Sequence, residues 1–179
     1  MRRGAVTGVR LGLRIAALVL AALPALVRAQ LAPNGGEFRV NSHTAGSQSG
    51  PKVSTDAAGN FVVVWESFGQ DGDSDGVFGQ RFASSGAPLG GEFQVNTFTT
   101  SNQLYPAVAA AGNGDFVVVW TSFADQDGSG AGVFGQRYDG TGARVGGEFR
   151  INTTTSSDQR FAVVVLMRNS PPTRAPVPS

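Results

Sequence analysis

The chain has 179 residues, no cysteine, 15% charged residues and a formal net charge of +1. Without cysteine it cannot be a disulfide-stapled small protein, nor can it hold a metal centre that needs thiolate ligands. No dense basic block stands out beyond the N-terminal arginines, so the sequence predicts no nucleic-acid-binding surface. The 25 glycines and the low charge favour β structure with many turns.

Residues 1–29 have the pattern of a secretory signal peptide. Arginines without acids precede an uninterrupted apolar stretch at 15–27, and Val27-Arg28-Ala29 offers a cleavage site. This stretch of 13 residues is shorter than the roughly 20 that a membrane-spanning helix needs. We therefore expect a secreted or cell-surface location and no membrane span in the mature chain. Cleavage would remove five arginines and no acid, which leaves a net charge of about −4.

The rest of the chain is a tandem repeat in which three sequence blocks recur in the same order. They are Gly-Gly-Glu-Phe-x-(Val/Ile)-Asn at 35–41, 90–96 and 146–152, Phe-Val-Val-Val-Trp at 61–65 and 116–120, and Gly-Val-Phe-Gly-Gln-Arg at 76–81 and 132–137. The period is 55 or 56 residues, and Gln48, Gln103 and Gln159 keep the same register.

These repeats divide the mature chain into segments. The predicted segments are a linker at 30–34, repeats at 35–89 and 90–145, a partial repeat at 146–169 and a Pro-rich disordered tail at 170–179. Where the third Phe-Val-Val-Val-Trp block should fall, the Pro-rich tail stands instead. Either the tail is a genuine terminus or a longer repeat array has been truncated.

Each repeat is expected to form four short antiparallel strands. Phe38 and Val40 alternate with polar residues, as in a half-buried outer strand. Residues 61–65 are apolar on both faces, so this strand should be covered on both sides. The turn residues at 56–60 fit a hairpin connection. The sequence thus predicts an all-β fold of tandem four-stranded antiparallel repeats that resemble blades of an incomplete β-propeller, with a β-sandwich as the alternative.

Two complete repeats cannot close a propeller ring, which needs at least four blades. The chain would then remain an open pair of sheets, be a fragment, or associate with itself. We expect self-association through open β edges.

An acidic loop in the first repeat is a candidate calcium site. Three carboxylates alternate before a glycine, at Asp71, Asp73 and Asp75, which matches the opening of an oxygen-ligand calcium loop. The twelfth position carries Phe instead of the bidentate Glu of an EF-hand. The second repeat offers a weaker version at Asp125 and Asp127. A solvated acidic hairpin loop is the alternative.

No catalytic residue is predicted. Glu37, Glu92 and Glu148 recur at one position of every repeat, whereas an active site needs a unique constellation. We expect these glutamates to pair across strands, with Arg81 or Arg137 as candidate partners.

Aromatic residues are the remaining candidates for function. Trp65 and Trp120 end the most apolar strand and are predicted to pack in the core. Phe68 and Phe123, at the entrance of the acidic loop, are the candidates for contact with a ligand. His43 has no second histidine and receives no role.

Four sequence blocks carry a resemblance to known proteins. They are Gln-Asp-Gly at 70–72, Gly-Val-Phe-Gly-Gln-Arg-Phe at 76–82, Gly-Glu-Phe-Gln-Val-Asn at 91–96 and Phe-Val-Val-Val-Trp at 116–120. Together they resemble tandem repeats of large secreted or surface proteins of bacteria. Those proteins are often described as calcium-binding or adhesin-like, and their repeats as propeller-like. The resemblance covers residues 35 to about 160.

Together, these observations predict a secreted, non-enzymatic β-repeat module with a structural or adhesion-type binding role towards an unknown protein or glycan. Calcium would be an optional stabiliser. A carbohydrate-binding, lectin-like module is the first alternative, and a fragment of a secreted hydrolase is the second.

Overall fold

The computed structural model describes residues 36–123 and 125–164. All strands belong to one compact unit that begins at Arg39, while residues 36–38 belong to a separate N-terminal unit. The predicted signal peptide, linker and Pro-rich tail lie outside the described residues, as do residues 165–169 of the partial third repeat.

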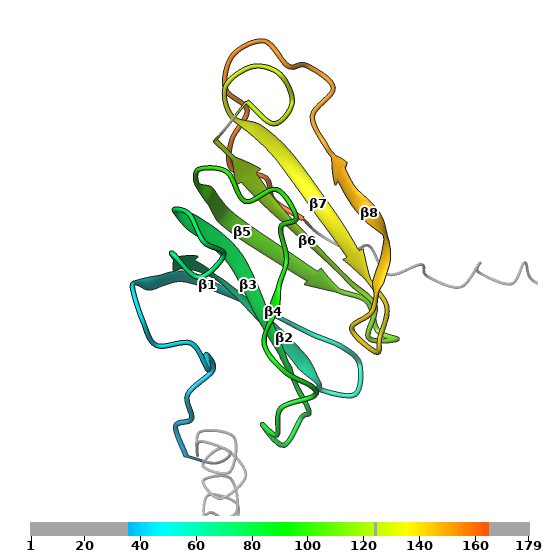
Figure 1. Ribbon diagram of the computed structural model, residues 1–179. Helices are drawn as coiled ribbons and strands as arrows, with labels where there is room; N and C mark the ends of the chain where they lie inside the picture. The colour runs from blue at the N-terminus through cyan, green and yellow to red at the C-terminus, as the bar shows by residue number, and fades with distance from the viewer. Residues whose placement is uncertain (1–35, 124, 165–179) are drawn as a thin grey trace, which may run out of the picture. The chain divides into compact units, whose positions relative to one another are not determined.

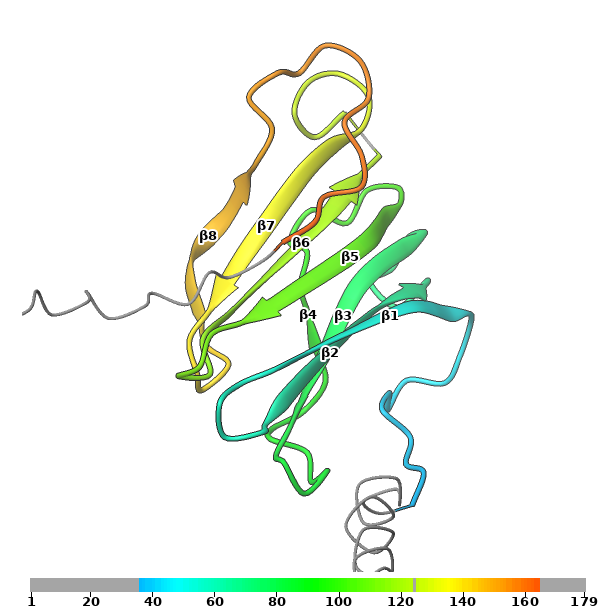
Figure 2. The same cartoon turned by 180° about the vertical axis from the view of Figure 1, so that it is seen from behind.

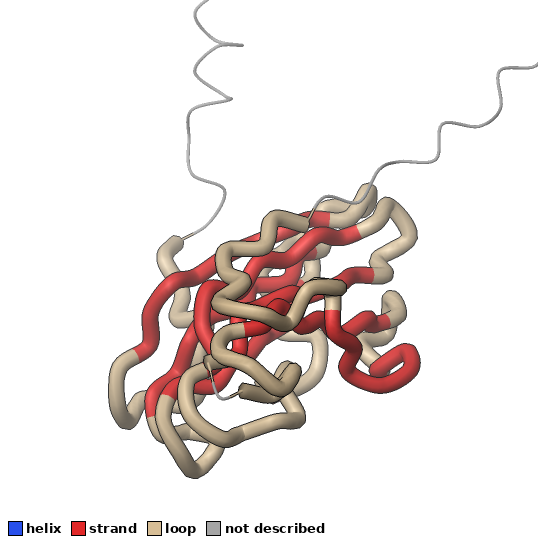
Figure 3. Tube along the Cα trace, turned by 90° about the horizontal axis from the view of Figure 1, so that it is seen from above, coloured by secondary structure: helices blue, strands red, loops and turns tan. Residues whose placement is uncertain are grey.

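Eight strands form two four-stranded antiparallel sheets (Figure 1). Sheet I contains β1 (Gln48–Thr55), β2 (Phe61–Phe68), β3 (Asp75–Phe82) and β4 (Phe93–Gln94), and sheet II contains β5 (Gln103–Ala110), β6 (Phe116–Ser122), β7 (Gly132–Tyr138) and β8 (Arg144–Arg150). In each sheet the strands follow their order in the chain. The described residues form no helix (Figure 3), so none there is long or apolar enough to cross a membrane.

The sheets are offset from the sequence repeats by one strand. β4 comes from the Gly-Gly-Glu-Phe block that opens the second repeat, yet it pairs with β3 of the first. In the same way β8, which contains the first five residues of the third copy of this block, pairs with β7. Each outer strand is therefore supplied by the following repeat, which ties neighbouring repeats together.

The Phe-Val-Val-Val-Trp strands have two different apolar faces, because side chains alternate along a strand. We call the face with the first, third and fifth residues the Trp face, and the opposite face the Val face. In β2 the Trp face carries Phe61, Val63 and Trp65, and the Val face carries Val62 and Val64. The same naming applies to β6.

The Val face of sheet I packs against the Trp face of sheet II. Their buried side chains form one cluster, made of Val62, Val64, Val77 and Val95 from sheet I and Phe116, Val118, Trp120, Phe134 and Tyr138 from sheet II. The other side of sheet I holds a second cluster, made of Val63, Trp65, Phe78 and Phe82, with Val40 and Phe61 against it. Both tryptophans are buried, which confirms their predicted place in the core.

Phe93 of β4 is the aromatic link between the sheets. Its ring centroid lies 6.3 Å from that of Phe116 and 5.3 Å from that of Tyr138, two rings that stack at 4.6 Å. Phe93 lies directly over Gly79 of β3, where a Cβ atom would come within 2.8 Å of the Phe93 ring. The absence of a side chain at Gly79 thus leaves room for the Phe93 ring.

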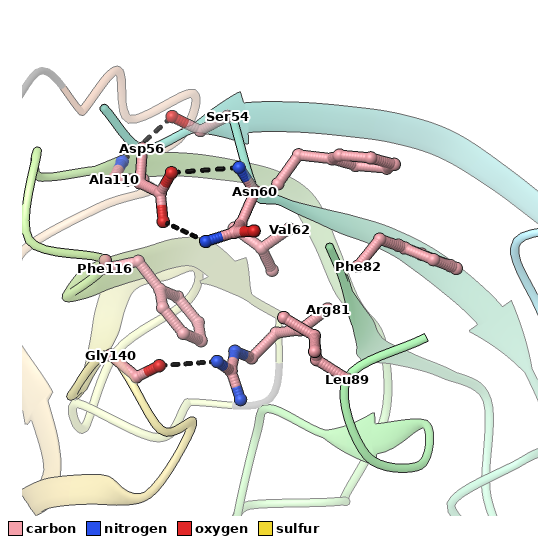
Figure 4. A pocket seen from close by; sticks show the side chains of 12 residues that line it. Ser54, Asp56, Asn60, Val62, Arg81, Phe82, Leu89, Ala110, Phe116 and Gly140 are labelled. Carbon is pink, nitrogen blue, oxygen red and sulfur yellow. Dashed lines mark hydrogen bonds between the residues drawn. The ribbon is translucent and has the colours of Figure 1, made fainter. Parts of the chain in front are cut away.

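Polar contacts join the sheets at one end (Figure 4). The Ala110 amide donates to Ser54 Oγ at 2.9 Å, and the Arg81 guanidinium donates to the carbonyl oxygens of Gly140, at 2.5 Å, and Thr141. Asp56 caps the adjacent turn by accepting from the Asn60 side chain at 2.9 Å.

The fold is all-β, with tandem four-stranded antiparallel sheets that resemble propeller blades, as predicted. Consecutive strands stay within one sheet as a meander, whereas a β-sandwich commonly connects its two sheets by Greek-key crossovers.

Candidate binding site

A β-bulge places an aromatic side chain on the first strand of sheet II. The pairing of β5 with β6 shifts between Leu104 and Ala107, and Tyr105 within the bulge has a φ of 57°. This left-handed backbone is uncommon for residues other than glycine. Gly50 at the same place in β1 has a φ of 61°, and Phe161 in the third repeat has a φ of 62°. The left-handed residue therefore recurs in all three repeats, each time two residues after the repeated glutamine, and in the first two it lies within a bulge.

Tyr105 and Phe161 form an aromatic cluster with Phe123. The Tyr105 ring centroid lies 4.7 Å from that of Phe161 and 6.0 Å from that of Phe123. Arg160 stands over the Phe123 ring at 4.6 Å. Tyr105 is 40% and Phe161 65% exposed, so both rings are accessible to a ligand.

A hollow of about 430 Å³ lies beside these rings. It runs across β1, β5 and residues 161–164, which reach this side of the molecule as the orange-red segment in Figure 2. Its walls are Gly50, Lys52, Glu66, Tyr105, Pro106, Ala107 and residues 161–164.

Glu66 fixes one side of the hollow. Its Oε1 accepts from the Tyr105 amide at 2.7 Å, and its Oε2 accepts from Ser49 Oγ at 3.0 Å. In sheet II, Thr121 takes the place of Glu66, and its Oγ1 accepts from the Phe161 amide at 3.4 Å. A side-chain oxygen of one repeat thus accepts from the amide of the left-handed residue of the next repeat.

The two predicted ligand-contact residues have different surroundings. Phe68 is exposed at the end of β2. Phe123 is only partly exposed and belongs to the cluster with Tyr105. Sequence reasoning missed Tyr105 and Phe161, although their constant distance from Gln103 and Gln159 was a usable signal.

In the acidic loop of the first repeat, the carboxylates accept hydrogen bonds from different partners. Asp71 Oδ2 accepts from the Asn96 side chain at 3.1 Å, and Asp73 Oδ2 accepts from the Ser101 amide at 2.7 Å. Burial raises the pKa of Asp75, and the charges of Glu66 and Asp71 raise it further.

In the second repeat, Asp127 Oδ2 accepts from the Asn152 side chain at 2.8 Å, while Asp125 accepts from the Gly130 amide. Asp127 is therefore the counterpart of Asp71. Within residues 36–123 and 125–164, no three His, Cys, Asp or Glu side chains are placed together to hold a metal ion.

The repeated glutamates connect neighbouring repeats through a loop instead of an arginine. Glu92 Oε2 accepts from the Ser42 amide at 2.7 Å and from its hydroxyl at 2.8 Å, and Gln70 donates to Glu92 Oε1 at 2.5 Å. Glu148 repeats this with Thr97, whose amide lies at 2.8 Å, and with Gln126.

The predicted arginine partners of these glutamates are wrong. Arg81 binds carbonyl oxygens of sheet II, and Arg137 stands over the Phe149 ring at 5.7 Å. A glutamate that accepts from backbone amides needs no cation, which is the physical reason for the difference.

No protein-family model matches the sequence, and no curated protein matches it either. Among solved structures, the chain is similar to an endo-arabinase from Bacteroides thetaiotaomicron VPI-5482, with 15% sequence identity and a TM-score of 0.43. The match covers 63% of this chain and 45% of the arabinase chain, so this chain spans less than half of it.

Proposed function

We propose that this chain is an exported, non-enzymatic β-repeat module that binds a saccharide at the hollow beside Tyr105 and Phe161. The observation that carries the proposal is the pair of exposed rings on the wall of a hollow that the polar residues Lys52 and Glu66 also line. Sugar rings present apolar faces to aromatic side chains and hydroxyls to polar groups, and such a mixed lining suits them.

The carboxylates support a role without catalysis. Among the described residues that line the hollow, Glu66 carries the one carboxylate, and it already accepts two hydrogen bonds. Glycoside hydrolysis commonly needs two carboxyl groups on either side of the scissile bond. Glu92 and Glu148 serve equivalent contacts in successive repeats.

Affinity electrophoresis in gels that each contain one soluble polysaccharide tests the proposal. The purified chain should be retarded in at least one gel, and Phe161→Ser should lower the affinity about fivefold to tenfold, since one ring contact contributes about 1 kcal/mol. Phe68→Ser is the matched control, because Phe68 is similarly exposed but lies outside the wall of the hollow. Absence of retardation in every gel, or equal losses in both variants, would contradict the proposal.

A further inference from the structure

The hollow beside Tyr105 is lined by equivalent positions of the three repeats. Two repeat positions, two residues apart, each contribute all of their copies: Gly50, Tyr105 and Phe161 at the first, and Lys52, Ala107 and Val163 at the second. The second position is therefore apolar in two repeats and cationic in the first. The sequence departs from its own repeat by placing one positive charge at this hollow.

Lys52 is the single lysine of the chain, whose other cationic side chains are arginines. A lysine ammonium group is a compact charge on a flexible four-carbon stem, and it has three donors that can rotate. It can therefore turn towards an anionic group whose exact position varies from one ligand to another.

The register of the strands directs the Lys52 side chain towards sheet II. Lys52 lies opposite Val64 of β2, and residues that lie opposite each other in an antiparallel pair share one face. Val64 is fully buried on the Val face, which packs against sheet II. Ser54, two residues further along the same face, accepts from the Ala110 amide of β5. Lys52 therefore leaves β1 on the side where β5 and the hollow lie.

The nearby carboxylate is engaged with other donors. Both oxygens of Glu66 accept hydrogen bonds, one from the Tyr105 amide and the other from the Ser49 hydroxyl. Within residues 36–123 and 125–164, Lys52 takes part in no ion pair. Its three ammonium donors are thus left for a ligand in the hollow.

We propose that the ligand of the hollow is an acidic saccharide, with Lys52 binding a carboxylate or sulfate group while Tyr105 and Phe161 contact the sugar rings. This inference rests on the proposed function and adds the charge of the ligand to it. Salt screens a partly sheltered ion pair less than one on an open surface, so a charge in the hollow contributes to selection of the ligand.

Affinity electrophoresis with matched pairs of polysaccharides tests the proposal. One pair is polygalacturonate and its methyl ester, and the other is dextran sulfate and dextran. The charged member of at least one pair should retard the purified chain more strongly than its neutral partner, and the pair that responds distinguishes a carboxylate from a sulfate ligand. Lys52→Met, which keeps the apolar stem, should lower the affinity for the charged polymer about threefold to fivefold. Lys52→Arg should keep most of this affinity, because it keeps the charge.

A second arginine variant controls for the overall charge of the chain. Arg150→Met removes the same charge from an exposed position outside the wall of the hollow, and it should bind as the wild type does. Lys52 is exposed, and the second repeat carries alanine at the equivalent position, so Lys52→Met should unfold at a thermal midpoint close to that of the wild type.

Chemical labelling measures the contact directly. Because Lys52 is the single lysine, an amine-reactive reagent modifies one side chain at this position and no other lysine. The charged polysaccharide should slow this modification, as measured by mass spectrometry of the peptide that contains Lys52. A rate that the polysaccharide does not change would overturn the proposal.

The outcomes separate this proposal from saccharide binding itself. Equal retardation by the charged and neutral members of both pairs, or equal losses in Lys52→Met and Arg150→Met, would overturn the acidic ligand. If a neutral polysaccharide then retards the chain and Phe161→Ser weakens that retardation, the proposed function stands alone. Retardation by no polysaccharide would overturn both.

Discussion

Glu92 and Ser42 join two repeats across 50 residues of sequence, because both the amide and the hydroxyl of Ser42 donate to one carboxylate oxygen of Glu92. Gln70 holds the other oxygen. Burial of Glu92 raises its pKa, but the hydrogen bonds from Gln70, Ser42 and His43 outweigh this effect, and the net result is a lowered pKa.

A carboxyl group with a lowered pKa in the folded state stabilises the protein above its unfolded pKa, and this contribution is lost as the pH falls through the folded pKa. Glu92→Gln should therefore lower the free energy of unfolding at neutral pH by about 1–2 kcal/mol. The difference in the free energy of unfolding between this variant and the wild type should become smaller at acidic pH. Urea unfolding at several pH values checks this, and a difference that does not change with pH would contradict it.

Trp120 and Trp65 should respond differently to the same substitution. Trp120 Nε1 donates to Gln103 Oε1 at 3.1 Å, and both residues are fully buried. Trp65 Nε1 is buried without a hydrogen-bond partner among the described residues. Trp120→Phe leaves a buried acceptor unsatisfied, so it should cost about 1–3 kcal/mol more than Trp65→Phe, the matched control. Urea unfolding measures both, and equal losses would refute the assigned bond.

Gly79→Ala should destabilise the protein by about 1–3 kcal/mol through overpacking. The new Cβ atom would lie 2.8 Å from the Phe93 ring and 3.3 Å from the Val63 carbonyl oxygen. Gly91→Ala is the control, because no atom lies within 4 Å of its added Cβ. Thermal unfolding distinguishes the two, and similar midpoints would show that Phe93 does not lie over Gly79.

Asp75→Asn should stabilise the protein at neutral pH. An acid with a raised folded pKa contributes stability below its unfolded pKa and loses it as the pH rises through the folded value. Removing its charge relieves repulsion from Glu66 and Asp71, so the thermal midpoint in chelator should rise, and the gain should vanish in acid. A midpoint lower than that of the wild type at neutral pH would contradict this.

Calcium binding by Asp71, Asp73 and Asp75, with the weaker second loop, stays a proposal. It predicts a higher thermal midpoint in calcium than in chelator, because a ligand that binds the folded state stabilises it. Asp71→Asn should remove this difference. Identical midpoints of the wild type in both conditions would refute the proposal.

The fold could be predicted from the sequence to a large extent. Buried strands and their tryptophans followed from the apolar run at 61–65, which has no polar face. The one-strand offset between the sheets and the sequence repeats could not be predicted as directly, because a repeating sequence does not show at which block each sheet begins. The pairings of β4 with β3 and of β8 with β7 show that a block opening one repeat completes the sheet of the repeat before it.

The candidate site was harder to predict. Tyr105 lies in a strand of small apolar residues and becomes exposed only through the bulge, which depends on its register with β6. The equivalent positions carry Gly, Tyr and Phe at 50, 105 and 161, so residue type alone did not mark them. Glu92 was assigned a structural role, but its Ser42 partner depends on how the loop closes in three dimensions.

The most direct test of the packing of the Val face of sheet I on the Trp face of sheet II is an engineered disulfide cross-link. Because the chain has no native cysteine, any disulfide must come from the introduced pair. Ser54 on the Val face of sheet I contacts Ala110 of sheet II. The double variant Ser54→Cys/Ala110→Cys should form an intramolecular disulfide under mild oxidation, seen as faster migration in non-reducing gels. Val53→Cys/Ala110→Cys should not form it, because Val53 points to the opposite face. A cross-link in the second variant but not in the first would contradict this packing.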